Sequence, residues 1–191
     1  SAAQILQALA NADGGHQSRQ YGIVSLTGGE ETFTGTGAGA WAGGVVGQSG
    51  NLRYAIQGNI LTGQPVVTAA EQALVTTPGG LPDKLMAAME AARAMGGDGR
   101  CSCSQFSPTA CGSPPPSFNK SSHIALMIVS RPSDVDAPCG AALGCGAGDY
   151  WLDLNVANQP ASAPDPVLTL QGLFQTWKQS QVGRPDHNAS T

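Results

Sequence analysis

The stretch Ile124-Ala125-Leu126-Met127-Ile128-Val129 decides the fold class, because it is a continuous apolar run of the length of a β-strand. A run of this kind is typical of a strand that is buried on both faces of a layered fold. Such a strand needs partner strands in its sheet and helices to cover that sheet. We therefore expect a mixed α/β fold in which this run is a covered strand.

Elements of both kinds are predicted on either side of this run. Helices are expected at 2–11, from Pro65, at 81–95 and after Asp165-Pro166, and strands at 20–26, 31–35, 53–57 and 151–156. The segment 35–50 is rich in glycine around Trp41 and shows no periodicity, so we expect a loop there. The segment 101–118 contains three consecutive prolines, which neither a helix nor a central strand accommodates, so we expect a surface loop.

The composition excludes several classes of protein. The chain has 191 residues, of which 41% are hydrophobic, so it is not a disordered chain. None of its apolar runs approaches the roughly 18 residues that a membrane span requires. The net charge is −4 and the nine basic residues are dispersed, which provides no basic surface for nucleic acid. We expect one domain over 1–178, with an insertion at 101–118 and a polar tail at 179–191, and neither nucleic acid nor a membrane as a partner.

Five cysteines fall in two clusters, Cys101, Cys103 and Cys111 and then Cys139 and Cys145. The spacing does not fit a zinc site, which favours Cys-x2-Cys pairs or nearby histidines, so no metal and no other cofactor is expected. Disulfides fit better: Cys139 with Cys145, and two of the first three with each other. The odd cysteine is either free or bonded to another chain.

Cysteine usage and two sequons favour a secreted protein. The sequons begin at Asn119 and Asn188 and predict N-glycosylation. The chain starts at Ser1 without methionine, so we expect a mature or processed form.

Several strings together resemble domain-of-unknown-function family 1028, a branch of the N-terminal-nucleophile (Ntn) hydrolase superfamily. The strings, in chain order, are Arg19-Gln20-Tyr21-Gly22-Ile23-Val24, Thr34-Gly35, Tyr54-Ala55-Ile56-Gln57-Gly58-Asn59-Ile60-Leu61, Leu81-Pro82-Asp83-Lys84-Leu85-Met86-Ala87-Ala88-Met89, Gly97-Asp98-Gly99-Arg100-Cys101, Ser121-Ser122-His123-Ile124-Ala125, Trp151-Leu152-Asp153-Leu154 and Asp165-Pro166-Val167. The resemblance covers the chain from Ser1 to Trp177, and Gln57-Gly58-Asn59 is its most specific element. A cysteine directly after the Asp-x-Arg string is similar to the family's secreted branch.

The resemblance implies a four-layer αββα sandwich of Ntn-hydrolase type. It also implies that family members begin with several strands, where the nucleophile of the superfamily lies, and that this chain corresponds to the C-terminal part of the domain, lacking those first strands. A sheet without those strands would expose unpaired edges. We therefore expect a partner to fill the gap: the N-terminal segment as a separate chain, which the odd cysteine, for example Cys101, would tether, or a neighbouring copy in a homo-oligomer.

Five residues are candidates for catalysis. Asn59 ends a strand and can direct its amide at a developing oxyanion, with Gln57 alongside, or it can simply cap the next turn. Asp98 and Arg100 form either a polar anchor near the site or a structural ion pair. Ser1 has a free amine beside its hydroxyl, as in Ntn hydrolases, but its sequence context predicts the N-cap of a helix.

Two functions are compatible with these observations. The first is a secreted Ntn-like hydrolase domain that cleaves an amide or related bond once a separate N-terminal segment completes it. The second is a non-catalytic extracellular assembly subunit that self-associates or pairs with a partner chain, for which low charge and abundant glycine are favourable.

Overall fold

The computed structural model describes residues 1–135, 148–157, 159–160 and 162–182. Its elements are α1 (Ala2–Ala12), η1 (His16–Ser18), β1 (Gln20–Ser25), β2 (Gly29–Thr34), β3 (Gly43–Ser49), β4 (Leu52–Gly58), α2 (Pro65–Thr76), α3 (Leu81–Ala94), α4 (Gly99–Ser102), β5 (Ala125–Val129), β6 (Leu152–Val156) and α5 (Pro166–Gln181). This is a mixed α+β fold with small antiparallel sheets, which confirms the expected fold class at that level.

The helices begin where local chemistry favours a start. Ser1 caps α1 in a capping box, in which the Ser1 hydroxyl accepts from the Gln4 backbone N–H at 3.3 Å. Pro65 occupies the first turn of α2, where its missing N–H is not needed. Asp165 caps α5 by accepting from the Val167 backbone N–H at 2.9 Å. The expected helices are therefore confirmed, and α5 extends to Gln181, beyond the predicted end of the domain at 178.

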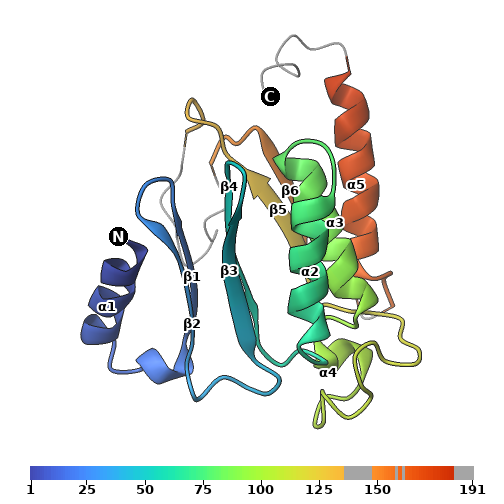
Figure 1. The fold of residues 1–191 in the computed structure, drawn as a ribbon. Coiled ribbons are helices and arrows are strands. Elements are labelled where there is room, and N and C mark those ends of the chain that lie inside the picture. Colours follow the sequence, from blue (N-terminus) through green and yellow to red (C-terminus); the bar gives the residue numbers. More distant parts are fainter. Residues whose placement is uncertain (136–147, 158, 161, 183–191) are drawn as a thin grey trace.

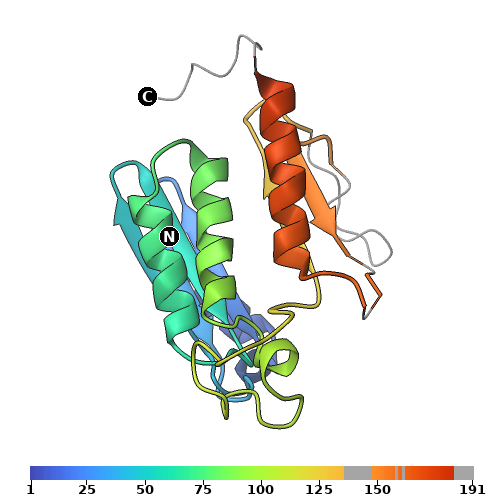
Figure 2. The ribbon, with the colours of Figure 1, turned by 90° about the vertical axis from the view of Figure 1, so that its right-hand side faces the viewer.

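Three antiparallel hairpins, β1–β2, β3–β4 and β5–β6, form the sheets among the described residues. The first two hairpins lie face to face, with α1 on the outer side of β1–β2 and with α2 and α3 on the outer side of β3–β4 (Figure 1). The β5–β6 hairpin lies beyond α3 and carries α5 on one face (Figure 2).

The prediction of a loop over 35–50 is wrong for its second half, because Gly43–Ser49 forms strand β3. Its glycines obscured the strand pattern, yet they serve close packing within the sheet. A Cβ atom on Gly44 would lie 2.8 Å from Cβ of Gln57 on the neighbouring strand, closer than two such carbons can approach. The glycines of β3 are therefore explained by close contact between strands, which the periodicity of the sequence does not reveal.

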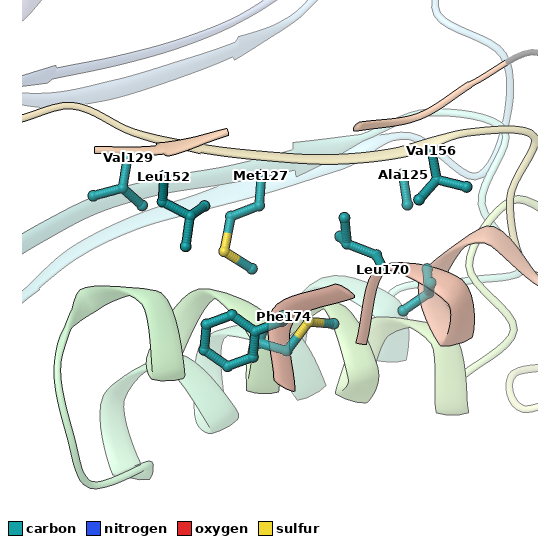
Figure 3. Close-up of a cluster of buried hydrophobic side chains, with 9 residues drawn as sticks. Ala125, Met127, Val129, Leu152, Val156, Leu170 and Phe174 are labelled. Carbon is teal, nitrogen blue, oxygen red and sulfur yellow. The ribbon is translucent and has the colours of Figure 1, made fainter. Parts of the chain in front are cut away.

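The run that starts at Ile124 forms β5, but the described residues bury it on one face only. Ala125, Met127 and Val129 point into the core, whereas Leu126 is 48% exposed. Figure 3 shows the buried face, where these side chains meet Leu152 and Val156 of β6 and Leu170 and Phe174 of α5. The expectation of burial on both faces is thus wrong for this chain, because no described element covers the face that bears Leu126.

The cysteine- and proline-rich segment 101–118 is irregular after α4 ends at Ser102, as expected for a loop. In the described part of the chain, we find no helix that is long and apolar enough to cross a membrane.

Candidate functional site

A pocket of about 300 Å³ opens where β4 ends, between α2, α3 and the segment that leads into β5. Its walls are mainly apolar. Its polar members include Gln57, Asp98, Ser121 and Ser122, and we call this set the polar pocket. Concave sites with a few convergent polar groups in an apolar lining are typical ligand-binding sites. The side-chain amide of Gln57 points away from this pocket, because it lies on the opposite face of β4, where a Cβ atom on Gly22 of β1 would be 2.4 Å from its Oε1.

The two serines of the polar pocket have hydroxyl groups that are buried and find no hydrogen-bond partner among the described residues. Ser121 is only 2% exposed. Leaving a buried polar group unpaired costs about 1–3 kcal/mol, so native proteins seldom leave one without a reason. The hydroxyls of Ser121 and Ser122 are therefore free to bind a group that enters the pocket.

A buried carboxylate holds this wall of the pocket in place. The Asp165 side chain is fully buried and accepts from the Ser121 backbone N–H at 2.9 Å. It also accepts from Nε of Arg93 on α3 at 3.0 Å. One carboxylate thus joins α3, α5 and the segment before β5, which fixes the position of Ser121.

Asp98 and Arg100 form an ion pair, in which Nε of Arg100 donates to Oδ1 of Asp98 at 3.0 Å. The same carboxylate caps α4 by accepting from the Arg100 backbone N–H at 2.9 Å. Hydrogen bonding to this carboxylate raises the pKa of the Arg100 guanidinium above its ordinary value. The geometry is that of the structural ion pair, although Asp98 also faces the pocket.

Asn59 follows the end of β4, is not among the residues that line the polar pocket, and has its amide engaged elsewhere. Its Nδ2 donates to Oε1 of Gln20 at 3.1 Å. The other end of the Gln20 amide donates to the Gly58 carbonyl at 2.9 Å and to Oγ1 of Thr34 at 2.9 Å. Gln20 of β1 therefore ties the end of β4 to the opposite sheet, with Asn59 as part of that tie.

Ser1 is placed at the outer helix layer, at the start of α1 (Figure 1). Its terminal amine donates to Oε1 of Gln4 at 2.7 Å. Ser1 is thus the expected N-cap, and it is not among the residues that line the polar pocket.

Cys103 and Cys111 form a disulfide, which confirms the prediction that two of the first three cysteines pair. Cys101 is free, and burial raises the pKa of its thiol to about 11. The predicted Cys139–Cys145 pair and the sequon at Asn188 lie outside the described residues, whereas Asn119 is exposed.

The fold brings a histidine to Cys101, although none is near it in sequence. The ligand atoms of Asp98, Cys101 and His123 lie within 4.8 Å of one another. Sulfur, nitrogen and carboxylate oxygen are donor types that zinc accepts, so these three residues could hold a metal. A cation there would compete with Arg100 for the Asp98 carboxylate.

Comparison with known proteins assigns the chain to a family. The model of the family of unknown function DUF1028 matches residues 1–107, which is more than half of the chain. The chain belongs to DUF1028. No curated protein matches it.

A crystal structure of a DUF1028 protein from Silicibacter pomeroyi is similar to the chain, with a TM-score of 0.60 and 19% sequence identity. The match covers 96% of this chain and 61% of that protein. This chain therefore spans less than two thirds of the length of its solved DUF1028 relative, and at this identity the likeness shows the fold alone.

Sequence reasoning on this DUF1028 chain missed the residues that hold the pocket together. The sequence marks Asp165 as a helix start and as part of a family string, and it marks Gln20 as the first residue of a predicted strand and as part of another such string. A buried helix cap that also pairs with Arg93 has no local signature, because its partners lie 72 and 44 residues away. The one available signal is that Gln20 is a polar residue at the start of a predicted strand.

Proposed function

We propose that this chain is part of an αββα sandwich of Ntn-hydrolase type, which cleaves an amide or related bond when polypeptide from outside residues 1–191 completes its sheets. The observation that carries this proposal is the polar pocket, in which the buried hydroxyls of Ser121 and Ser122 have no partner among the described residues. Hydroxyl donors in an apolar pocket stabilise an oxyanion that develops during acyl transfer. The layering of α1, the two hairpins, and α2 with α3 supports the sandwich (Figure 1).

In this proposal the completing polypeptide carries the nucleophile. An Ntn hydrolase attacks with an amino-terminal Ser, Thr or Cys whose own amine serves as the base. The amine and hydroxyl of Ser1 are both bonded within the first turn of α1. Within the chain, the hydroxyls of Ser121 and Ser122 would bind the substrate. Gln57 and Asn59 would act as positioning residues at the end of β4, Asn59 through its bond to Gln20, and the Asp98–Arg100 pair would hold the edge of the pocket in place.

We further propose that the protein works outside the cell, in an oxidising compartment. The Cys103–Cys111 disulfide supports this, because such bonds persist mainly in secreted proteins. Asn119 is exposed, as a glycan acceptor must be.

The test of the enzymatic proposal is the turnover of chromogenic acyl amides by protein purified from its source. We expect Ser121→Ala to lower kcat/KM by at least tenfold, because it removes an unpaired hydroxyl from the pocket. Ser49→Ala is the matched control, since Ser49 is exposed at the end of β3. Unchanged turnover in Ser121→Ala, or an accompanying chain that begins with a residue other than Ser, Thr or Cys, would refute the proposal.

A second candidate, a non-catalytic assembly subunit, is favoured by the apolar residues that the open sheet leaves exposed, such as Leu126 at 48%. Exposed apolar surface of this kind marks interaction sites. Sedimentation at decreasing concentration distinguishes the two, because an assembly subunit forms larger species that dissociate on dilution and have no hydrolytic activity.

A further inference from the structure

An apolar groove of about 490 Å³ separates β4 from β5, and we call it the β4–β5 groove. Leu52 to Ile56 of β4 form one wall and Leu126 to Ile128 of β5 form the other. Its floor includes Leu85, Ala88, Met89 and Ala92 of α3. The groove meets the polar pocket, because Ile56, Ala70, Met89 and Ala92 line both.

Each wall of the groove is an unpaired sheet edge. Among the described residues, β4 pairs with β3 alone and β5 pairs with β6 alone. The β3–β4 hairpin closes through the two-residue turn Gly50-Asn51, so its closing pair Ser49–Leu52 is hydrogen-bonded. By alternation, the backbone groups of Arg53, Ala55 and Gln57 then point away from β3, toward the groove. Among the described residues, two rows of unsatisfied backbone donors and acceptors therefore border the β4–β5 groove.

The groove lacks the devices that keep natural sheet edges unpaired. Neither β4 nor β5 contains proline or lysine. The only charged residue in its lining is Arg53, whose Nη1 donates to Oε2 of Glu30 at 2.7 Å. An edge of this composition is suited to pairing with another strand.

We propose that the β4–β5 groove binds an extended β-segment from polypeptide outside residues 1–191, which pairs with the free edge of β4, of β5, or of both. The inference rests on the proposed function for the existence of that polypeptide, and it adds where the segment binds and what chemistry it has. The segment is uncharged, it places apolar side chains at alternate positions against α3, and it ends in a polar group beside Ser121 and Ser122.

Other occupants fit the groove less well. A small apolar molecule would fill the space but would leave the backbone groups of both edges unsatisfied. A second copy would have to insert a strand, whereas every described strand is already held in a hairpin. The solved relative from Silicibacter pomeroyi has more than a third of its chain outside the match, which is a source of such segments in this family.

The test is hydrogen exchange, measured by mass spectrometry on the protein purified from its source, combined with its native mass. We expect the amides of Arg53, Ala55 and Gln57 to exchange on the order of a hundredfold more slowly than free amides, since opening a paired strand costs several kcal/mol. The native mass should exceed the 19.3 kDa of this chain by a further polypeptide.

A matched pair of variants locates the contact. Leu126→Arg places a charge in the groove at a residue that is 48% exposed, and Leu168→Arg places the same charge on α5 at a residue that is 43% exposed and does not line the groove. We expect Leu126→Arg alone to release the segment and to restore fast exchange at Ala55. Protection of the β1–β2 hairpin in both variants shows that each is folded.

Three results would overturn the proposal. Fast exchange of the Ala55 amide in the native protein would show an empty groove. Slow exchange in a 19.3 kDa monomer would show that no other polypeptide is needed, and a mass that is a multiple of 19.3 kDa would show a second copy instead. Loss of turnover in Ser121→Ala bears on catalysis alone and leaves these outcomes unchanged.

Discussion

Replacing Asp165 by alanine tests the view that one buried carboxylate holds the wall of the pocket. The side chain is fully buried and has three partners: the backbone N–H groups of Val167 and Ser121 and the guanidinium of Arg93. Loss of a helix N-cap costs about 1 kcal/mol. The buried N–H of Ser121, left without an acceptor, costs about 1–3 kcal/mol.

The contribution of Arg93 is smaller than that of a fully buried partner. The Arg93 side chain is 26% exposed, so water can replace part of the interaction with the lost carboxylate. We assign about 1 kcal/mol to the loss of this ion pair. The total loss for Asp165→Ala is then about 3–5 kcal/mol, a large part of the 5–15 kcal/mol by which domains are usually stable. Asp165→Asn should lose about half as much, because its amide oxygen still caps α5.

Urea unfolding followed by tryptophan fluorescence measures this loss. With an m-value of about 2 kcal/mol/M, the midpoint of Asp165→Ala should fall by roughly 1.5–2.5 M. Asp153→Ala is the control, since Asp153 is exposed on β6 and should change stability by less than about 0.5 kcal/mol. A midpoint shift below about 0.5 M for Asp165→Ala, or an equal shift for Asp153→Ala, would refute the reasoning.

Four further outcomes are expected. Burial raises the pKa of the Cys101 thiol to about 11 from 9.0, so iodoacetamide at pH 8 should alkylate the folded protein about a hundredfold more slowly than the unfolded protein. The same shift predicts that the free energy of unfolding falls as the pH rises from about 9 through 11, because the folded state holds the proton of the Cys101 thiol more tightly than the unfolded state does. Calorimetry of the wild type and of Cys101→Ser across this pH range checks the sign of the change. Replacing Cys103 and Cys111 together by alanine should lower stability by up to about 2.5 kcal/mol, as loop-closure entropy for a separation of 8 residues implies, and an unchanged melting temperature would contradict this. Gly97→Ala should lower stability by more than about 2 kcal/mol in urea unfolding, because Gly97 has a φ of 57° and a Cβ atom there would lie 2.5 Å from the Ser121 carbonyl oxygen.

Sequence patterns predicted those elements whose boundaries are set locally. The helix starts at Ser1, Pro65 and Asp165 follow from capping and from the fixed φ of proline, which act within one turn. Strand β3 escaped prediction because its glycines are explained by the approach of Gln57 from the next strand, a contact between chain segments.

The candidate site was predicted only in part for the same reason. The string around Gln57 and the Asp98–Arg100 pair were singled out, and both border the polar pocket. The convergence of His123 on Cys101, and of Ser121 on Asp165, depends on how distant segments pack. A sequence shows which side chains can do chemistry, whereas the distances that permit it arise from the tertiary fold.

The Cys103–Cys111 disulfide closes part of the insertion into a short loop. Its two Cα atoms are 5.6 Å apart, so the chain leaves the bridge close to where it entered. Exposed residues between the two cysteines, such as Phe106, can therefore be exchanged or extended while the entry and exit points stay fixed, whereas Pro108 packs against Gly99 and must be kept. Sequence changes at the exposed positions should leave the remainder of the fold unchanged, and so should a foreign epitope inserted there.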